Sequence, residues 1–325
     1  MAALLALGGW LALSGLVNLA GPRPRWQEAN RRVLLLVVLV FFAGFGLIVW
    51  LHQALHQAFA LELPAQLGTW LNNQLAAGNL GLGGLPAYDP GHPPRDRLPY
   101  WIENEKYFFW FWCFAGLSLR VHGRTRLHRL RAAILLMVAV TIAILAVWAD
   151  PFRSPLPRFF AEVQPWLTES AAPVERLSLF MRLYPRLVFY YNASYMWIHP
   201  PLLFIAYAGL GIFFVSSVGM LFRRDAAIEA VGYEAARLSY SSLTLGMLLG
   251  LPWALTAWGP NWWWDPKIAS SIMLWLVFST ALHTRLYKDR PGMWYFTASL
   301  GVLSFVAMIF TFVASFLFPG EHTFQ

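Results

Sequence analysis

Long apolar stretches dominate the sequence and alternate with short polar connections. Each stretch is close to the ~20 residues that an α-helix needs to cross a bilayer. There are eight of them, near residues 3–20, 33–51, 104–120, 132–149, 200–222, 239–257, 269–287 and 293–318. This pattern predicts an all-α fold, a polytopic transmembrane helix bundle with about eight spans. The third stretch is the least typical, because Glu103, Glu105 and Lys106 crowd its start.

Positive charge gathers in alternate connections between these stretches. The cationic connections follow the first, third, fifth and seventh stretches, with Arg23, Arg25, Arg31 and Arg32, then Arg120, Arg124, Arg126, Arg129 and Arg131, then Arg223, Arg224 and Arg237, then Arg285, Lys288 and Arg290. With eight spans these connections share one side, and short cationic connections mark the cytoplasmic side. Both termini are then predicted to lie on the outer, periplasmic side. We interpret 3–20 as a retained span and not as a cleaved signal peptide.

Two long segments, 52–103 and 150–199, are predicted to lie outside the membrane. Residues 52–72 have the pattern of an amphipathic helix at the interface. Residues 76–95 are rich in Gly and Pro and predict irregular structure. Residues 156–190 alternate apolar positions with Arg and Glu, which predicts one or two surface helices.

Composition agrees with lipid as the main solvent. The chain is 58% hydrophobic and only 12% charged, whereas soluble domains carry roughly a quarter charged residues. The net charge of +8 reflects the cationic connections. No basic stripe is interleaved with stacking aromatics, so we expect no nucleic-acid partner. The single cysteine, Cys113, excludes an intrachain disulfide and a CxxC pair, and we expect it to be a packed membrane residue.

The most informative segment is the loop 258–268, which opens with W-G-P-N-W-W-W-D-P-K. Its tryptophans are Trp258, Trp262, Trp263 and Trp264. Such a cluster suits a large planar ligand, since aromatic stacking adds roughly 0.5–1.5 kcal/mol per pair beyond burial. Interfacial anchoring is the alternative interpretation. Anchoring tryptophans are usually scattered, however, and do not need the accompanying Gly259, Asp265 and Pro266.

Three histidines are candidate metal ligands. His199 precedes Pro200 at the outer mouth of the fifth stretch, and His322 lies just past the outer end of the eighth. Two imidazoles on either side of one plane are what a six-coordinate haem iron needs. His283 lies within the seventh stretch, where ionisable residues are costly and by default functional.

The loop resembles the tryptophan-rich WWD signature of the haem-handling proteins of cytochrome c maturation. Within that superfamily the similarity is greatest to the CcsA (ResC) proteins, through the stretches 271–276 and 282–285 and the P-G-x-H ending at His322. The H-P-P at His199 is more similar to the larger CcmF relatives. The resemblance covers about 190–325.

This resemblance implies a membrane protein that delivers haem b, with axial histidine ligation, for thioether attachment to the CxxCH motif of apocytochrome c. It implies a platform made of Trp258, Gly259, Trp262, Trp263, Trp264, Asp265 and Pro266. His199 and His322 would ligate haem iron outside, and His283 would hold haem in transit. The implied holocytochrome c synthase (haem lyase) includes a ResB- or CcsB-type partner. We divide the chain into an N-terminal transmembrane region, 1–150, and a C-terminal haem-handling region, 151–325.

Some positions depart from the family pattern. Ile268 stands where the family has an acidic residue. The transmembrane site lacks a second histidine, because His52 and His56 lie at the outer end of the second stretch. We predict that a partner chain supplies this ligand. The remaining candidates, His122 and His128, are predicted to be solvated in a cationic loop.

Alternative functions remain open at this point. A non-covalent haem-bearing electron-transfer or structural subunit would place paired histidines within spans, and a transporter would leave the tryptophans unexplained. Outer arginines are candidates for pairing with haem propionates, namely Arg153, Arg158, Arg176, Arg182 and Arg186. A bacterial inner membrane is favoured as the location over a plastid thylakoid.

Overall fold

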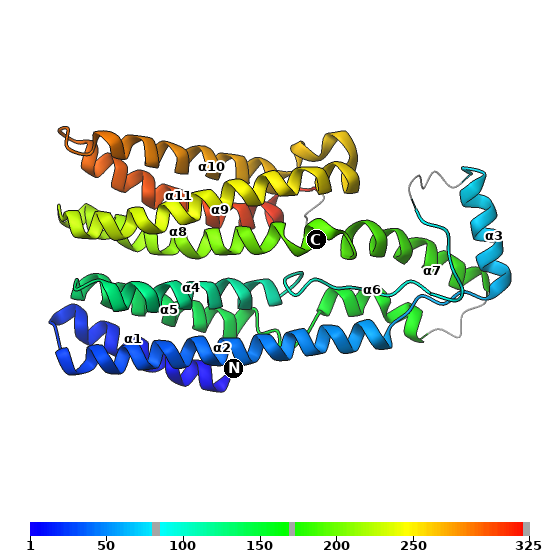
Figure 1. Ribbon diagram of the computed structural model, residues 1–325, viewed down its shortest axis with the longest axis horizontal. Helices are drawn as coiled ribbons and strands as arrows, with labels where there is room; N and C mark the ends of the chain where they lie inside the picture. The colour runs from blue at the N-terminus through cyan, green and yellow to red at the C-terminus, as the bar shows by residue number, and fades with distance from the viewer. Residues whose placement is uncertain (80–84, 169–172, 321–325) are drawn as a thin grey trace.

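Long helices lie side by side in one elongated bundle (Figure 1). The computed structural model describes residues 1–79, 85–168 and 173–320. The bundle helices are α1 (Ala2–Ala20), α2 (Pro24–Ala58), α4 (Glu105–Arg124), α5 (His128–Trp148), α8 (His199–Phe222), α9 (Ala226–Trp258), α10 (Pro266–Thr284) and α11 (Met293–Leu317). Among the described residues there is no strand, only an isolated antiparallel bridge between Ala60 and Arg95. The all-α prediction is confirmed.

Six of these helices are long and apolar enough to cross a membrane. They are α1, α2, α5, α8 with the turn before it, α9 and α11. The other two, α4 and α10, have 20 and 19 residues and lie within the same bundle, although they are not among these six. A polytopic membrane protein is therefore confirmed. The predicted count of eight spans includes α4 and α10 only because both helices lie in the bundle.

The four cationic connections all lie at one end of the bundle (Figure 1). The start of α1 and the end of α11 lie toward the opposite end. At the cationic end two carboxylates of α9 hold the connections together. Glu234 pairs with Arg120 at 2.9 Å and with Arg124 at 3.0 Å, while the buried Glu229 pairs with Lys288 at 2.8 Å. Which end faces the cytoplasm stays a prediction.

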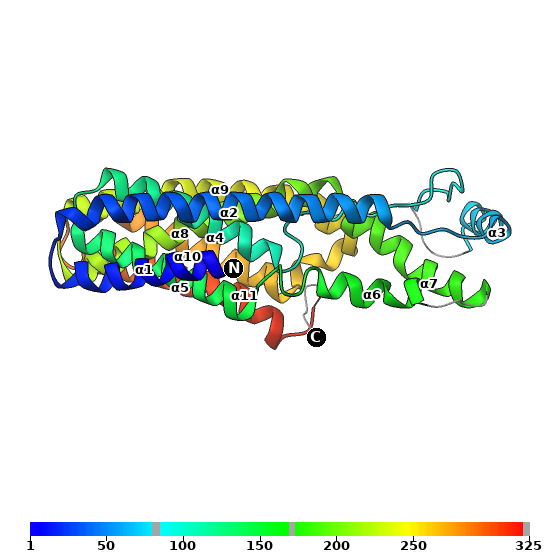
Figure 2. The same ribbon diagram turned by 90° about the horizontal axis from the view of Figure 1, so that it is seen from below.

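A smaller lobe projects from the opposite end (Figure 2). It contains α3 (Ala65–Ala76), α6 (Pro157–Thr168) and α7 (Pro173–Arg186), followed by a π-helical turn over Leu187–Tyr191. The predicted surface helices in 156–190 are confirmed as two. The single interfacial helix expected over 52–72 is wrong, because α2 continues to Ala58 and the chain is extended before Pro64 starts α3.

The lobe has its own apolar core, drawn from both outer segments. Its largest members include Phe59, Leu71, Tyr88, Phe159, Trp166 and Phe180. With 35 residues, α2 is about 52 Å long, well beyond the ~30 Å hydrocarbon thickness of a bilayer. Its excess length therefore carries the lobe, which packs against the mouth of the bundle. The division at residue 150 stays a prediction, and this core contains residues from both sides of it.

Candidate functional site

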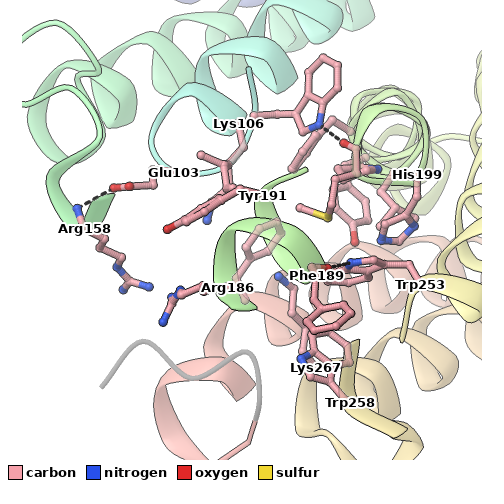
Figure 3. Close-up of a pocket in the computed structure, with 18 of the residues that line it drawn as sticks. Glu103, Lys106, Arg158, Arg186, Phe189, Tyr191, His199, Trp253, Trp258 and Lys267 are labelled. Atoms are coloured by element: carbon pink, nitrogen blue, oxygen red, sulfur yellow. Dashed lines mark hydrogen bonds between the residues drawn. The ribbon is translucent and has the colours of Figure 1, made fainter. Parts of the chain in front are cut away.

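A cavity of about 430 Å³ lies where the lobe meets the bundle (Figure 3). Its walls come from α4, α6 to α11 and the segments that connect them. Nine of the described lining residues carry aromatic rings: Trp101, Phe189, Tyr191, His199, Phe204, Tyr207, Trp253, Trp258 and Phe312. The cavity therefore brings together residues that are far apart in the sequence, and it is built mainly from the C-terminal half of the chain.

His199 projects into this cavity from the first residue of α8. The following Pro200 and Pro201 lack N–H groups, which suits them to the start of a helix. The imidazole Nδ1 lies 2.7 Å from the carbonyl oxygen of Gly246 in α9, so that Nδ1 carries the proton and donates it. In the neutral ring this leaves Nε2 with a lone pair, as a metal-binding histidine requires.

Gly250, one helical turn after Gly246, makes this placement possible. A Cβ atom on Gly250 would lie 2.7 Å from Cε1 of His199, closer than real Cβ contacts occur. The imidazole therefore lies directly against the α9 backbone. Trp253, a little further along α9, lies beside the same imidazole, with its ring centroid 6.2 Å away at an angle of 31°.

Of the predicted tryptophan platform, only Trp258 lines the cavity. It contacts Trp253 edge-on, with ring centroids 4.6 Å apart. The indole N–H of Trp253 donates to the carbonyl oxygen of Phe189 at 3.2 Å and so connects α9 to the lobe. Trp263 and Trp264 stack on each other at 4.3 Å instead and are 49% and 71% exposed, while Trp262 is half-buried. The predicted platform thus has an inward-facing part and an outward-facing part.

Four cations also line the cavity, namely Lys106, Arg158, Arg186 and Lys267. Arg158 and Arg186 extend from the lobe on the side away from His199 (Figure 3). Of the other predicted arginines, Arg176 instead covers the Trp166 ring, and Arg153 and Arg182 do not line the cavity. Among the described residues the lining contains one carboxylate, Glu103, so the cavity suits an anionic ligand.

Two carboxylates hold the cationic side in place. Both oxygens of Glu103 accept hydrogen bonds from the start of α6, from the backbone N–H groups of Arg158 and Phe159 at 2.9 Å each. Glu162 pairs with Arg186 at 2.9 Å. Burial raises the pKa of Glu162, although the guanidinium of Arg186 acts against this shift.

The end of the tryptophan loop has a structural role of its own. Asp265 is buried and accepts the backbone N–H groups of Lys267 at 2.9 Å and Ile268 at 3.3 Å, which caps α10. Gly259 has a φ of +72°, a conformation that favours glycine. A Cβ on Gly320 would lie 2.7 Å from an oxygen of Asp265, so the chain leaving α11 returns to this loop. His322 lies outside the described residues.

His283 is separate from the cavity. It lies in the last turn of α10, at the cationic end of the bundle, and is exposed. Its Nδ1 lies 2.7 Å from the carbonyl oxygen of Ser279, which again leaves Nε2 available. The prediction for His122 is wrong, since this side chain is only 3% exposed on the inward face of α4.

Sequence reasoning missed several residues of the cavity. Gly246 and Gly250 form a pair at helical spacing in L-G-M-L-L-G-L, a pattern that signals close packing but not its partner. Trp253 lies within an apolar stretch of the sequence, where nothing distinguishes it from a packed membrane residue. Lys106 and Lys267 stand next to span ends, where cations are common, and only the fold brings them together.

Comparison with known proteins gives a family match. The family model described as "Cytochrome C assembly protein" matches residues 101–322, more than half of the chain. Among curated relatives, the "Cytochrome c biogenesis protein CcsA" of Cyanidium caldarium is 43% identical over 77 residues, which cover 23% of this chain and 26% of the relative. The CcsA protein of Trieres chinensis is 35% identical over 111 residues, covering 34% and 35% of the two chains.

The CcsA protein of Synechococcus sp. (strain WH7803) is 37% identical over 89 residues, covering 26% of this chain and 27% of the relative. The matched segments thus span about a quarter to a third of the length of these relatives. No solved structure matches this chain.

Proposed function

This chain belongs to the cytochrome c assembly protein family, and from that premise we propose that it binds haem in the cavity at the mouth of its bundle and delivers it for attachment to apocytochrome c. The observation that carries the proposal is the position of the His199 side chain in the cavity. Its Nδ1 is held by Gly246 and its remaining nitrogen belongs to a ring that lines an aromatic and cationic cavity. We propose that the ligand is haem b and that His199 and His322 would hold its iron.

The residues present fit such a ligand in three respects. An imidazole whose Nδ1 donates to a carbonyl has the tautomer and orientation for iron ligation through Nε2. Trp253 and Trp258 add apolar aromatic surface to the cavity wall, with their rings at 68° to each other, so that at most one of them can lie parallel to a porphyrin. Arg158 and Arg186 suit the two propionates, because a guanidinium pairs with a carboxylate through two parallel hydrogen bonds.

In this proposal the protein works by positioning. The bound haem supplies two vinyl groups, each of which adds one cysteine thiol of a CxxCH motif. Holding the reactants in place supplies several kcal/mol of such a barrier. Trp253 and Trp258 would exclude water from the cavity, while the exposed pair Trp263 and Trp264 would contact the acceptor from outside.

We propose further that a ResB- or CcsB-type partner completes the holocytochrome c synthase. His283 is exposed at the cationic end of α10 with its Nδ1 already bound to Ser279, so a histidine from a partner helix could complete a second iron site. The proposed location is the bacterial inner membrane, with the lobe on the periplasmic side.

A haem-binding assay tests the proposal at its central residue. We expect His199→Gly to lower the haem content of the purified protein, measured as the pyridine haemochrome, and to recover part of it when the cells are grown with free imidazole. The matched control is His92→Gly, because His92 is exposed in the lobe, pairs with Asp89 and does not line the cavity. Haem content of this control should equal that of the wild type.

A deletion strain tests the second half of the proposal. Loss of the gene should abolish covalent haem in the c-type cytochromes of the host, scored by haem staining of denaturing gels. Unchanged haem content in the His199 variant would contradict the assigned site. Normal cytochromes c in the deletion strain would contradict the assembly function.

A further inference from the structure

A pair of histidines outside the main cavity has the features of a metal site. His52 and His56 lie four residues apart on one face of α2, in the part of the helix that projects toward the lobe. This is the spacing at which two histidines of one helix bind a single metal ion. Both line a second cavity of about 400 Å³, together with Gln53, Arg97, Leu98, Tyr100 and Trp197.

Both imidazoles are fixed by the same extended segment. Nδ1 of His52 lies 2.9 Å from the carbonyl oxygen of Leu98, and Nδ1 of His56 lies 2.7 Å from that of Asp96. Since a carbonyl only accepts, both Nδ1 atoms carry the proton. Each neutral ring then presents the lone pair of Nε2, which is the arrangement found in metal-ligating histidines.

The Nε2 atom of His52 provides the second, independent observation. His52 is 3% exposed, and this nitrogen is buried without a hydrogen-bond partner in the described part of the chain. Buried polar atoms nearly always have a partner, and an orphaned one calls for an explanation such as an ion. An imidazole whose Nδ1 is hydrogen-bonded and whose Nε2 has no such partner is suited to coordinating a metal ion through Nε2.

We propose that Nε2 of His52 and Nε2 of His56 bind one divalent late transition-metal ion. Imidazole suits such ions, and Cu²⁺ is bound most tightly of the first-row divalent series. Among the described residues, no group of three or more His, Cys, Asp or Glu side chains is placed to hold a metal. In this proposal the two imidazoles hold the ion, and water fills the rest of its coordination sphere.

This site is distinct from the cavity proposed for haem. Tyr100, Trp101 and Trp197 pack between the two, with Trp197 edge-on to Trp101 at 5.8 Å and to Tyr100 at 5.1 Å. The indole N–H of Trp101 donates to the carbonyl oxygen of Met196 at 2.6 Å, which holds this aromatic wall in place. The Nδ1 hydrogen bonds of His52 and His56 join α2 to the segment that leads to Trp101 in the wall of the haem cavity.

Copper binding to the purified full-length protein, carrying a tag without histidines, tests the proposal. We expect one Cu²⁺ per chain by isothermal titration, with an electron paramagnetic resonance spectrum that shows two coordinating nitrogens, and weaker binding of Zn²⁺. His52→Asn and His56→Asn are the decisive variants. An asparagine amide retains a donor close to the position of Nδ1 and removes Nε2, so each should weaken copper binding by ~10-fold or more without unfolding the lobe.

Two further variants complete the test. Arg97→Gln removes an exposed cation from the lining and is expected to tighten copper binding, because like charges repel. His92→Asn, in the lobe but outside this cavity, should leave it unchanged. Equal copper binding by wild type and both asparagine variants overturns the proposal. Failure of haem binding alone, with copper binding intact, overturns only the function proposed above.

Discussion

His199 depends on two glycines of the neighbouring helix. Gly246 offers its carbonyl to Nδ1, and Gly250 leaves the space in which the imidazole lies. From the sequence, the proline pair after His199 predicts a helix start, and the predicted topology places His199 near the outer interface. The orientation of the imidazole ring could not be predicted, because it depends on a carbonyl 47 residues further along the chain.

Enlarging Gly250 tests this dependence. We expect Gly250→Ala to push the imidazole away from α9 and to lower haem affinity by roughly 10–100-fold, the usual effect of disturbing the support of a metal ligand. Absorbance titration with haem measures this change. Gly116→Ala in α4 is the matched control, since no atom lies within 4 Å of the Cβ it would add. Equal haem affinity in both variants would contradict the proposed dependence of His199 on Gly250.

At the scale of elements, α6 is held at its start by a residue from another segment. The first N–H groups of a helix have no partner within it, and Glu103 accepts two of them from 55 and 56 residues away. The helix itself was predictable from its alternating pattern. The position of α6 was not predictable. The capping carboxylate of Glu103 lies next to α4, and in the sequence it has the pattern of the charged start of a membrane span.

Removing this carboxylate should loosen the cationic side of the cavity. We expect Glu103→Ala to destabilise the start of α6 by about 1–3 kcal/mol, because the buried N–H of Phe159 and the partly buried N–H of Arg158 lose their acceptor. Hydrogen–deuterium exchange of the peptide covering 157–168 would reveal this as faster exchange. Glu62→Ala, at an exposed lobe position, serves as control. Unchanged protection in the Glu103 variant would show that solvent replaces the cap.

At the scale of the molecule, positive charge and the lobe lie at opposite ends of the bundle. The four cationic connections that suggested a cytoplasmic side lie together at one end, and the lobe lies at the other (Figure 1). Glu229 and Glu234 neutralise part of this charge within the protein. The excess length of α2 explains how a lobe of surface helices is supported beyond the membrane.

Sidedness can be measured because the chain has a single cysteine, Cys113. In a Cys113→Ala background, we expect Trp70→Cys in α3 to react with a membrane-impermeant maleimide in intact spheroplasts. Arg224→Cys, between α8 and α9, should react only after the membrane is permeabilised. The reverse pattern would invert the predicted topology and place the lobe in the cytoplasm.

The sequence by itself determined the helical class, the membrane solvent and the segment that carries the family signature. These properties follow from runs of neighbouring residues, such as the apolar stretch after Pro201 or the tryptophans from 262 to 264. Tertiary structure alone decided which side chains share a cavity. Trp258 faces inward while Trp263 and Trp264 face outward, and Lys106 joins Arg186 across 80 positions, because helix packing and not sequence distance sets contacts in a bundle.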